Sequence, residues 1–202
     1  MTADHVLVTY ADVQQEAWIA FRAWHERDHF PRLLECPGFI SGSGFESIGG
    51  EPMFLTIFEL ESPDAISTSR AREALRWHPW GRLLRGWHRR VYRRIFQEAG
   101  EDGETDSAAP FLLTVRVDIV ATDELQFNRW YNDVHIPEVL GCPGFLRAAR
   151  WESLEGEPRF LALYDLDRAD VLSTPEMKSV YGFGPMEPCI RSEHGRIYAR
   201  RF

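Results

Sequence analysis

The sequence predicts an α+β protein made of two tandem βαββαβ repeats. The segment Trp24–Pro31 is followed by Cys36-Pro37-Gly38-Phe39, and 106 positions later Trp130–Pro137 is followed by Cys142-Pro143-Gly144-Phe145. The order of β-rich and helix-like segments is also the same in both halves. Similarity at one constant spacing marks a duplicated module, and a chain of 202 residues has room for two small domains.

The boundaries of the repeats follow from the segment between them. Residues 98–107 are rich in acidic residues and glycine and poor in apolar residues, a composition typical of a solvated loop. We therefore expect a first repeat over residues 1–97, an acidic linker over 98–110 and a second repeat over 111–202.

Each repeat is expected to begin with a strand and a helix. Residues 6–10 and 111–115 are short β-rich runs, which predict the opening strands. Residues 16–34 carry large apolar side chains at helical spacing and predict a helix. The Cys-Pro-Gly-Phe tetrapeptides should end these helices, because proline lacks a donor and glycine allows a left-handed turn.

The rest of each repeat is expected to contain a hairpin, a second helix and a last strand. In the first repeat the strands at 39–47 and 53–61 flank Gly49-Gly50-Glu51-Pro52, a hairpin signal. A helix is expected from about 63 to 76 and a strand over 87–96. This order is the ferredoxin-like arrangement. One such unit leaves a sheet face that needs cover, and a second copy in the same chain can provide it.

Several motifs resemble the EthD-like members of the dimeric α+β barrel superfamily. They are the segment Trp130–Glu138, the following Pro143-Gly144-Phe145, and a strand region with Pro158 and Tyr164-Asp165. The resemblance covers both halves and is clearer in the second. It implies that the two repeats form an intramolecular dimeric-type α+β barrel, but it specifies the chemistry weakly. The superfamily contains cofactor-free monooxygenases, polyketide cyclases, lyases, haem-degrading enzymes and proteins of unknown role.

Composition narrows the range of partners. The net charge of -8 argues against nucleic acid, although the arginine- and tryptophan-rich stretch 70–94 could bind phosphate or stack on bases. No apolar run reaches the ~20 residues that span a bilayer, and no signal-peptide pattern is evident. The three cysteines lack metal-type spacing. We expect a cytoplasmic protein, monomeric or homodimeric, with no nucleic-acid or membrane partner.

One short motif matches a zinc-protease signature. His25-Glu26-Arg27-Asp28-His29 fits His-Glu-x-x-His, in which two histidines one turn apart hold zinc. The second repeat replaces the first histidine with Tyr131, and Pro31 is expected to interrupt the helix. No third ligand stands at a familiar distance. We therefore expect no metal site.

The histidine that both repeats keep is the stronger candidate for chemistry. His29 and His135 lie at the edge of the predicted inward helix face, next to His25 and Tyr131 respectively. A histidine there can exchange a proton near neutral pH. The alternative is a structural histidine that anchors the turn before Cys-Pro-Gly-Phe.

The predicted last strand keeps one face in both repeats. The identical alternating residues are His88, Arg90, Tyr92, Arg94 and Phe96, matched by His194, Arg196, Tyr198, Arg200 and Phe202. The opposite face shares no identities. The retained face could line a pocket, or it could pack against the other sheet. We interpret its arginines and phenylalanine as packing residues and leave both roles open for His88, His194, Tyr92 and Tyr198.

These candidates lead to a functional prediction. We expect cofactor-independent acid/base chemistry of the lyase, cyclase or isomerase type on a small aromatic or polyketide-like molecule. A cofactor-free oxygenase of an activated phenol and a non-catalytic binding protein are the alternatives. The sequence does not decide which repeat acts.

Catalysis is expected from His135, His29, Tyr131, His25, Tyr198, His194 and His88, and substrate contacts from Trp130, Trp24, Tyr92, Trp77, Trp80 and Arg116. The segments 77–80 and 183–186 are expected to form a loop over the pocket mouth.

Overall fold

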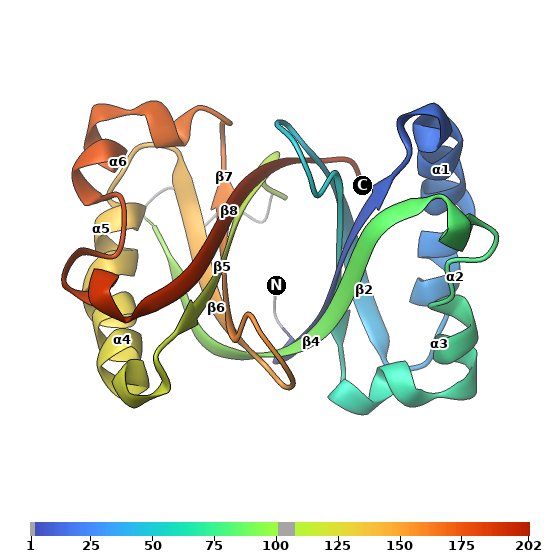
Figure 1. Ribbon diagram of the computed structural model, residues 1–202, viewed down its shortest axis with the longest axis horizontal. Helices are drawn as coiled ribbons and strands as arrows, with labels where there is room; N and C mark the ends of the chain where they lie inside the picture. Colours follow the sequence, from blue (N-terminus) through green and yellow to red (C-terminus); the bar gives the residue numbers. More distant parts are fainter. Residues whose placement is uncertain (1–2, 101–107) are drawn as a thin grey trace. The chain divides into compact units, whose positions relative to one another are not determined.

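The computed structural model describes residues 3–100 and 108–202, so residues 101–107 of the expected linker lie outside the described part. The chain divides into two compact units. Residues up to Arg93, together with Arg201 and Phe202, form the first unit, and residues 94–200 form the second unit. Each unit contains a four-stranded antiparallel sheet with its helices on one face (Figure 1). The predicted α+β class with two ferredoxin-like repeats is confirmed.

In the first unit the sheet order is β4-β1-β3-β2, the order of a ferredoxin-like repeat. The strands are β1 (His5–Val13), β2 (Phe39–Ser47), β3 (Phe54–Leu60) and β4 (Leu84–Ala99), whose residues after Arg93 belong to the second unit. The helices are α1 (Trp18–Trp24), α2 (Phe30–Leu34) and α3 (Ser69–Ala74). The helix expected over 63–76 is instead a 3-10 turn over Pro63–Ser67 followed by α3. Thr68 separates the two, because it has an extended backbone and its side chain accepts a bond from the Ala71 N–H.

The second unit repeats this order as β8-β5-β7-β6. The strands are β5 (Phe111–Ile119), β6 (Phe145–Ser153), β7 (Phe160–Leu166) and β8 (Ile190–Arg200). The helices are α4 (Glu124–Trp130), α5 (Ile136–Leu140) and α6 (Pro175–Val180). One core cluster packs helix residues such as Phe127 and Val139 against sheet residues such as Val117 and Ile197.

The first long helix of each repeat contains a π-helical turn that the sequence did not reveal. It covers His25–His29 in the first unit and Tyr131–His135 in the second. The prediction that Pro31 interrupts the helix was wrong, because Pro31 lies in α2 directly after the π turn. A wider turn is tolerated there because proline has no N–H to donate to the carbonyl four residues earlier.

The last strand of the first repeat extends beyond its expected bounds of 87–96. β4 continues to Ala99, two residues into the predicted linker, and Gly100 N–H donates to the Leu146 carbonyl at 2.8 Å. At the other end of the chain, Gly44 N–H donates to the Phe202 carbonyl and Arg201 N–H donates to Gly44. In the part of the chain described, no helix is long and apolar enough to cross a membrane.

Candidate functional site

The second unit contains a cavity of about 60 Å³ between its helices and its sheet. Most of its wall is apolar or aromatic. Polar side chains reach it from Tyr131, His135, Tyr164 and Glu193. Apolar walls with a few placed polar groups are the usual composition of a small-molecule site.

The π turn brings Tyr131 and His135 onto one face of the helix. It is closed by the Ile136 N–H, which bonds to the Tyr131 carbonyl five residues earlier. Residues four apart are therefore almost one full turn apart, and both side chains point to the sheet. Their rings meet edge to face at 4.8 Å, and both residues are buried. π turns of this kind are frequent at functional sites.

His135 lies between two aromatic rings. Trp130 stacks on it at 4.9 Å between ring centres, and Phe183 lies nearly parallel to it at 6.4 Å. Burial lowers the pKa of His135 from 6.5 to about 4, with a further lowering contribution from the Arg150 charge. The imidazole is therefore neutral at physiological pH and has a free lone pair for a proton.

Tyr131 and Tyr164 form a buried hydroxyl pair in the cavity wall. The Tyr164 hydroxyl donates to the Tyr131 hydroxyl at 3.1 Å. Burial raises the pKa of both phenols, most strongly that of Tyr164. Both are protonated at neutral pH, and together they offer one further O–H donor to a bound oxygen atom.

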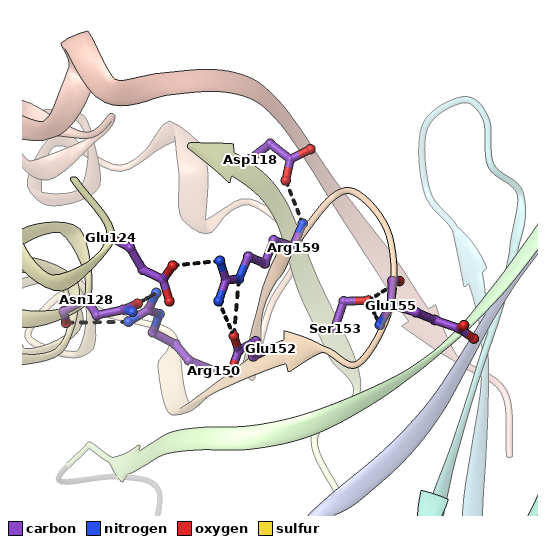
Figure 2. A network of polar contacts seen from close by, with 8 residues as sticks. All are labelled: Asp118, Glu124, Asn128, Arg150, Glu152, Ser153, Glu155 and Arg159. Carbon is purple, nitrogen blue, oxygen red and sulfur yellow. Dashed lines mark hydrogen bonds and ion pairs between the residues drawn. The ribbon is translucent and has the colours of Figure 1, made fainter. Parts of the chain in front are cut away.

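Arg150 on β6 lies behind Tyr131 and is only 1% exposed. Its guanidinium is 4.2 Å from the Tyr131 ring centre and donates to the side-chain oxygens of Asn128 and Asn132, each at 2.7 Å (Figure 2 shows Asn128). Burial lowers the pKa of Arg150 to about 10, so it remains charged. A buried cation held by neutral amides is costly in the absence of an anion.

A neighbouring network holds the helix that carries these groups. Arg159 on the β6–β7 hairpin pairs with Glu124 at 2.6 Å and with Glu152 at 2.7 Å, and its N–H donates to Asp118 at 2.7 Å (Figure 2). Glu124 is the first residue of α4. The Arg159 network therefore joins the start of α4 to the sheet, four residues before Asn128.

The corresponding region of the first unit is filled by side chains. Arg89 stands where the second unit has Gly195, and Trp77 and Leu75 stand where it has Phe183 and Tyr181. Arg89 donates to the Leu75 carbonyl at 3.4 Å, and only about 10 Å³ remains free beside it. That is room for roughly one water molecule. Of these two corresponding cavities, the one in the second unit is the larger.

The histidine pair of the first unit is not arranged as a zinc protease site. His25 bonds to the Thr56 hydroxyl at 3.2 Å, and its ring centre is 5.4 Å from that of His29. Glu26 points to Arg22, with which it forms an ion pair at 3.2 Å. Burial lowers the pKa of His25 to about 4 and that of His29 to about 3. No group of three metal-binding side chains occurs among the residues described.

The predicted aromatic contacts assemble around the two histidines. In the first unit Trp24 and Trp77 stack on His29 at 4.7 and 4.9 Å, and Trp80 packs edge-on against Phe21. In the second unit Trp130 takes the place of Trp24. Of the expected mouth loop, Phe183 lines the second-unit cavity.

The retained face of the last strands is separate from these cavities. In β8, Glu193 and Gly195 line the cavity, so the alternating His194 and Tyr198 point to the opposite face of the strand. Arg116 lies opposite His194 in the β5–β8 register. In β4, Arg89 lines the first-unit cavity, so His88 and Tyr92 lie on the opposite face of that strand. There the His88 ring packs on the Tyr10 ring, with 4.6 Å between ring centres. None of these five candidates lines the second-unit cavity or the two smaller cavities beside His25 in the first unit.

Comparison with known proteins shows the fold and no nearer family. No protein-family model and no curated protein matches the sequence. An anthrone oxidase-like protein superimposes with a TM-score of 0.74 at 12% identity, over 98% of this chain and 91% of its own. A chlorite dismutase from Candidatus Nitrospira defluvii gives 0.68 at 11%, over 99% and 92%. A monooxygenase-like protein from Lactobacillus acidophilus NCFM gives 0.62 at 9%, over 97% and 93%. These structures are dimeric α+β barrel proteins, and the likeness establishes that fold.

Four residues at or beside this cavity were not among the site residues predicted from the sequence: Tyr164, Arg150, Glu193 and Gly195. For two of them, Arg150 and Gly195, a signal was present in the comparison between the repeats. Arg150 and Gly195 correspond to Gly44 and Arg89, so each repeat has an arginine where the other has a glycine. Such exchanges show where one copy fills a space that the other leaves open.

Proposed function

We propose that the second unit binds a small phenolic or related aromatic molecule and transfers a proton from it to His135. The observation that carries this proposal is the cavity in which a neutral, buried His135 faces the hydroxyl pair of Tyr131 and Tyr164. The first unit has a neutral histidine too, but its cavity is closed by Arg89 and Trp77.

His135, the Tyr131–Tyr164 pair and Arg150 would act together in one proton-transfer step. Nε2 or Nδ1 of neutral His135 accepts a proton from an acidic O–H or C–H of the substrate. The resulting oxyanion accepts a hydrogen bond from the Tyr131–Tyr164 pair. Arg150, whose guanidinium lies 4.2 Å from the Tyr131 ring centre, contributes a positive charge behind the hydroxyl pair that stabilises this oxyanion. The aromatic wall excludes water and strengthens these interactions.

Protonation of the anion at another position, or loss of a leaving group, gives the isomerase, cyclase or lyase outcome. A second candidate is a cofactor-free oxygenase, favoured by the fold likeness to anthrone oxidase-like and monooxygenase-like proteins. In that case the anion of an activated phenol reacts with dioxygen. A ring CH₂ becomes a carbonyl, and the second oxygen atom leaves as water.

The test is a thermal-shift screen of phenols, aromatic acids and polyketide fragments, followed by turnover and oxygen-electrode assays on the compounds that stabilise the protein. We expect His135→Ala to lower turnover by roughly 10²-fold or more, and His29→Ala to leave it nearly unchanged. Oxygen consumption matched to product identifies the oxygenase. Full turnover in His135→Ala would show the mechanism to be wrong, and saturable binding without turnover would identify a binding protein.

We also propose a family group and a cellular location for this chain. The EthD-like resemblance of Trp130–Glu138 supports a role within that group, and the composition supports a cytoplasmic location. The predicted roles of the other candidate residues are tested by the same assays, with Tyr198→Phe and His194→Ala as the first variants.

A further inference from the structure

We propose that Glu193 selects the ligand of the second-unit cavity, which takes a phenol carrying a second hydrogen-bond donor, preferably a cationic ammonium group, at its outer end. This inference rests on the proposed binding site and adds the class of molecule that the site accepts. It is carried by the distribution of charge along the cavity and by the comparison of the two repeats.

Charge in the cavity wall is confined to one side chain. All lining residues belong to the described part of the chain, and among them Glu193 is the one carboxylate, with no arginine or lysine beside it. His135 is neutral at physiological pH because burial lowers its pKa to about 4. A bound carboxylate would therefore meet a negative group with no cation in the wall, whereas a donor group would find an acceptor.

The polar groups are placed at two different depths. Tyr131 and Tyr164 are each 2% exposed and mark the inner end. Glu193 is an exposed residue, and Tyr181 beside the cavity is 64% exposed, so these two mark the mouth. Glu193 nevertheless acts on the inner groups, because its charge contributes to raising the pKa of Tyr131. A molecule that reaches from the hydroxyl pair to Glu193 satisfies both ends.

The cavity as it stands is smaller than an aromatic ring requires. About 60 Å³ is less than the roughly 150 Å³ of a cavity that holds benzene. An aromatic ring can therefore enter only if the residues at the mouth of the cavity move. The mouth residue Gly182 has φ 93° and is followed two residues later by Gly184 at φ 46°, and the exposed Tyr181 precedes both. The outer end of the ligand remains beside Tyr181 and Glu193.

The first unit shows which residue changes create this site. Trp87 and Arg89 stand at the positions of Glu193 and Gly195. There the Arg89 guanidinium lies 5.7 Å from the Trp87 ring centre and bonds to Leu75, so the chain itself supplies a planar cation to this region. The second unit has lost that cation and gained a carboxylate. In the second unit, a ligand with a cationic or neutral donor group would supply the hydrogen-bond donor that Arg89 supplies in the first unit.

The test uses three phenols that differ only in the group at the end of a short side chain. They are tyramine (ammonium), 4-hydroxyphenylethanol (hydroxyl) and 4-hydroxyphenylacetate (carboxylate), measured by titration calorimetry at pH 8, where Glu193 is ionised. We expect affinity to fall in that order, with tyramine binding about tenfold more tightly than the acid, a difference typical of one partly exposed charge interaction on each side.

Two variants and a control complete the experiment. Glu193→Gln should reduce the tyramine preference to about twofold or less, while Glu176→Gln on the surface of α6 makes the same charge change away from the cavity and should preserve it. Gly195→Arg should abolish binding of all three. The substituted side chain meets no atom within 4 Å at its Cβ and needs no unusual φ, so folding is expected to be retained. Gly195→Ala provides a smaller change, with unfolding by urea as the check.

The outcomes separate the inference from the proposed site. Equal affinity for the three phenols, or a tyramine preference that is unchanged in Glu193→Gln, would overturn the role of Glu193. In that case, loss of binding in Gly195→Arg would still support the cavity as the binding site. Binding that survives in Gly195→Arg, or no binding of any of the three by the wild type, would overturn the site and the inference together.

Discussion

The guanidinium of Arg150 lies 4.2 Å from the centre of the Tyr131 ring, in contact with a side chain that faces the cavity. The same guanidinium donates to Asn128 and Asn132, and both bonds hold the helix that carries Tyr131. The first unit has Gly44 at this position, where the ring of Phe202 covers the glycine. The second unit alone therefore has a buried positive charge behind its cavity wall.

We expect Arg150→Met to destabilise the protein by about 2–3 kcal/mol. The variant removes the cation–π contact with Tyr131 and the two hydrogen bonds to the half-buried amide oxygens of Asn128 and Asn132. Arg150→Lys keeps the charge but cannot bridge both asparagines, so it should recover only part of the loss. Urea unfolding measures both effects. A titration of tyrosine absorbance should also show a higher pKa for Tyr131 in Arg150→Met, because Arg150 lowers that pKa. A Met variant with wild-type stability and titration would contradict this role.

The hydrogen bond between Tyr131 and Tyr164 predicts that the losses of stability in the two single variants do not add up in the double variant. Tyr131→Phe leaves the buried Tyr164 hydroxyl without its acceptor at 3.1 Å, and Tyr164→Phe removes the donor to Tyr131. Each single variant should cost about 1–2 kcal/mol of stability, and the double variant should cost less than the sum, because no unpaired hydroxyl remains. A double-mutant cycle by urea unfolding measures the coupling. Strict additivity would show that the bond contributes nothing.

Buried neutral histidines predict a loss of stability in mild acid. The pKa of His135 is about 4 in the folded protein and 6.5 in the unfolded chain. Between these values the unfolded chain binds more protons, so the free energy of unfolding falls as pH drops from about 6.5 towards 4. For His135 the loss amounts to about 3 kcal/mol at the lower end. Unfolding at a series of pH values should show a smaller slope in His135→Gln. An unchanged slope would show that this histidine titrates normally.

Periodicity and repetition were sufficient to predict most of the fold. The 106-residue spacing, the hairpin around Gly49–Pro52 and the strand preceding each helix were all correct because they depend on local pattern. The π turns were missed because their four-residue spacing of inward side chains looks like an ordinary helix in sequence. The length of β4 was underestimated, because its last residues are paired by β6, far away in sequence.

The candidate site was predicted less completely. His135, Tyr131 and Trp130 were found because both repeats keep or exchange residues at those positions. The retained residues of β8, such as Tyr198, were equally prominent in sequence, yet they lie on the opposite face from the cavity. Alternation shows which residues share a face, but which face the helices cover depends on the tertiary arrangement. The free space over Gly195 has no sequence signal except the arginine in the other repeat.

That exchange allows the first unit to be opened deliberately. Arg89→Gly removes the side chain that fills the region beside His25 and His29, and should enlarge its cavity of about 10 Å³. We expect a small apolar phenol such as 4-methylphenol to bind at one site per chain in the wild type and at two in Arg89→Gly, measured by titration calorimetry. Arg93→Gly is the matched control, since it places glycine on the same face of the same strand without lining the cavity, and each glycine should cost about 1 kcal/mol of stability. A stoichiometry that stays at one in Arg89→Gly would show that Trp77 and Leu75 are sufficient to close the first unit, and that Arg89 does not decide which repeat can bind.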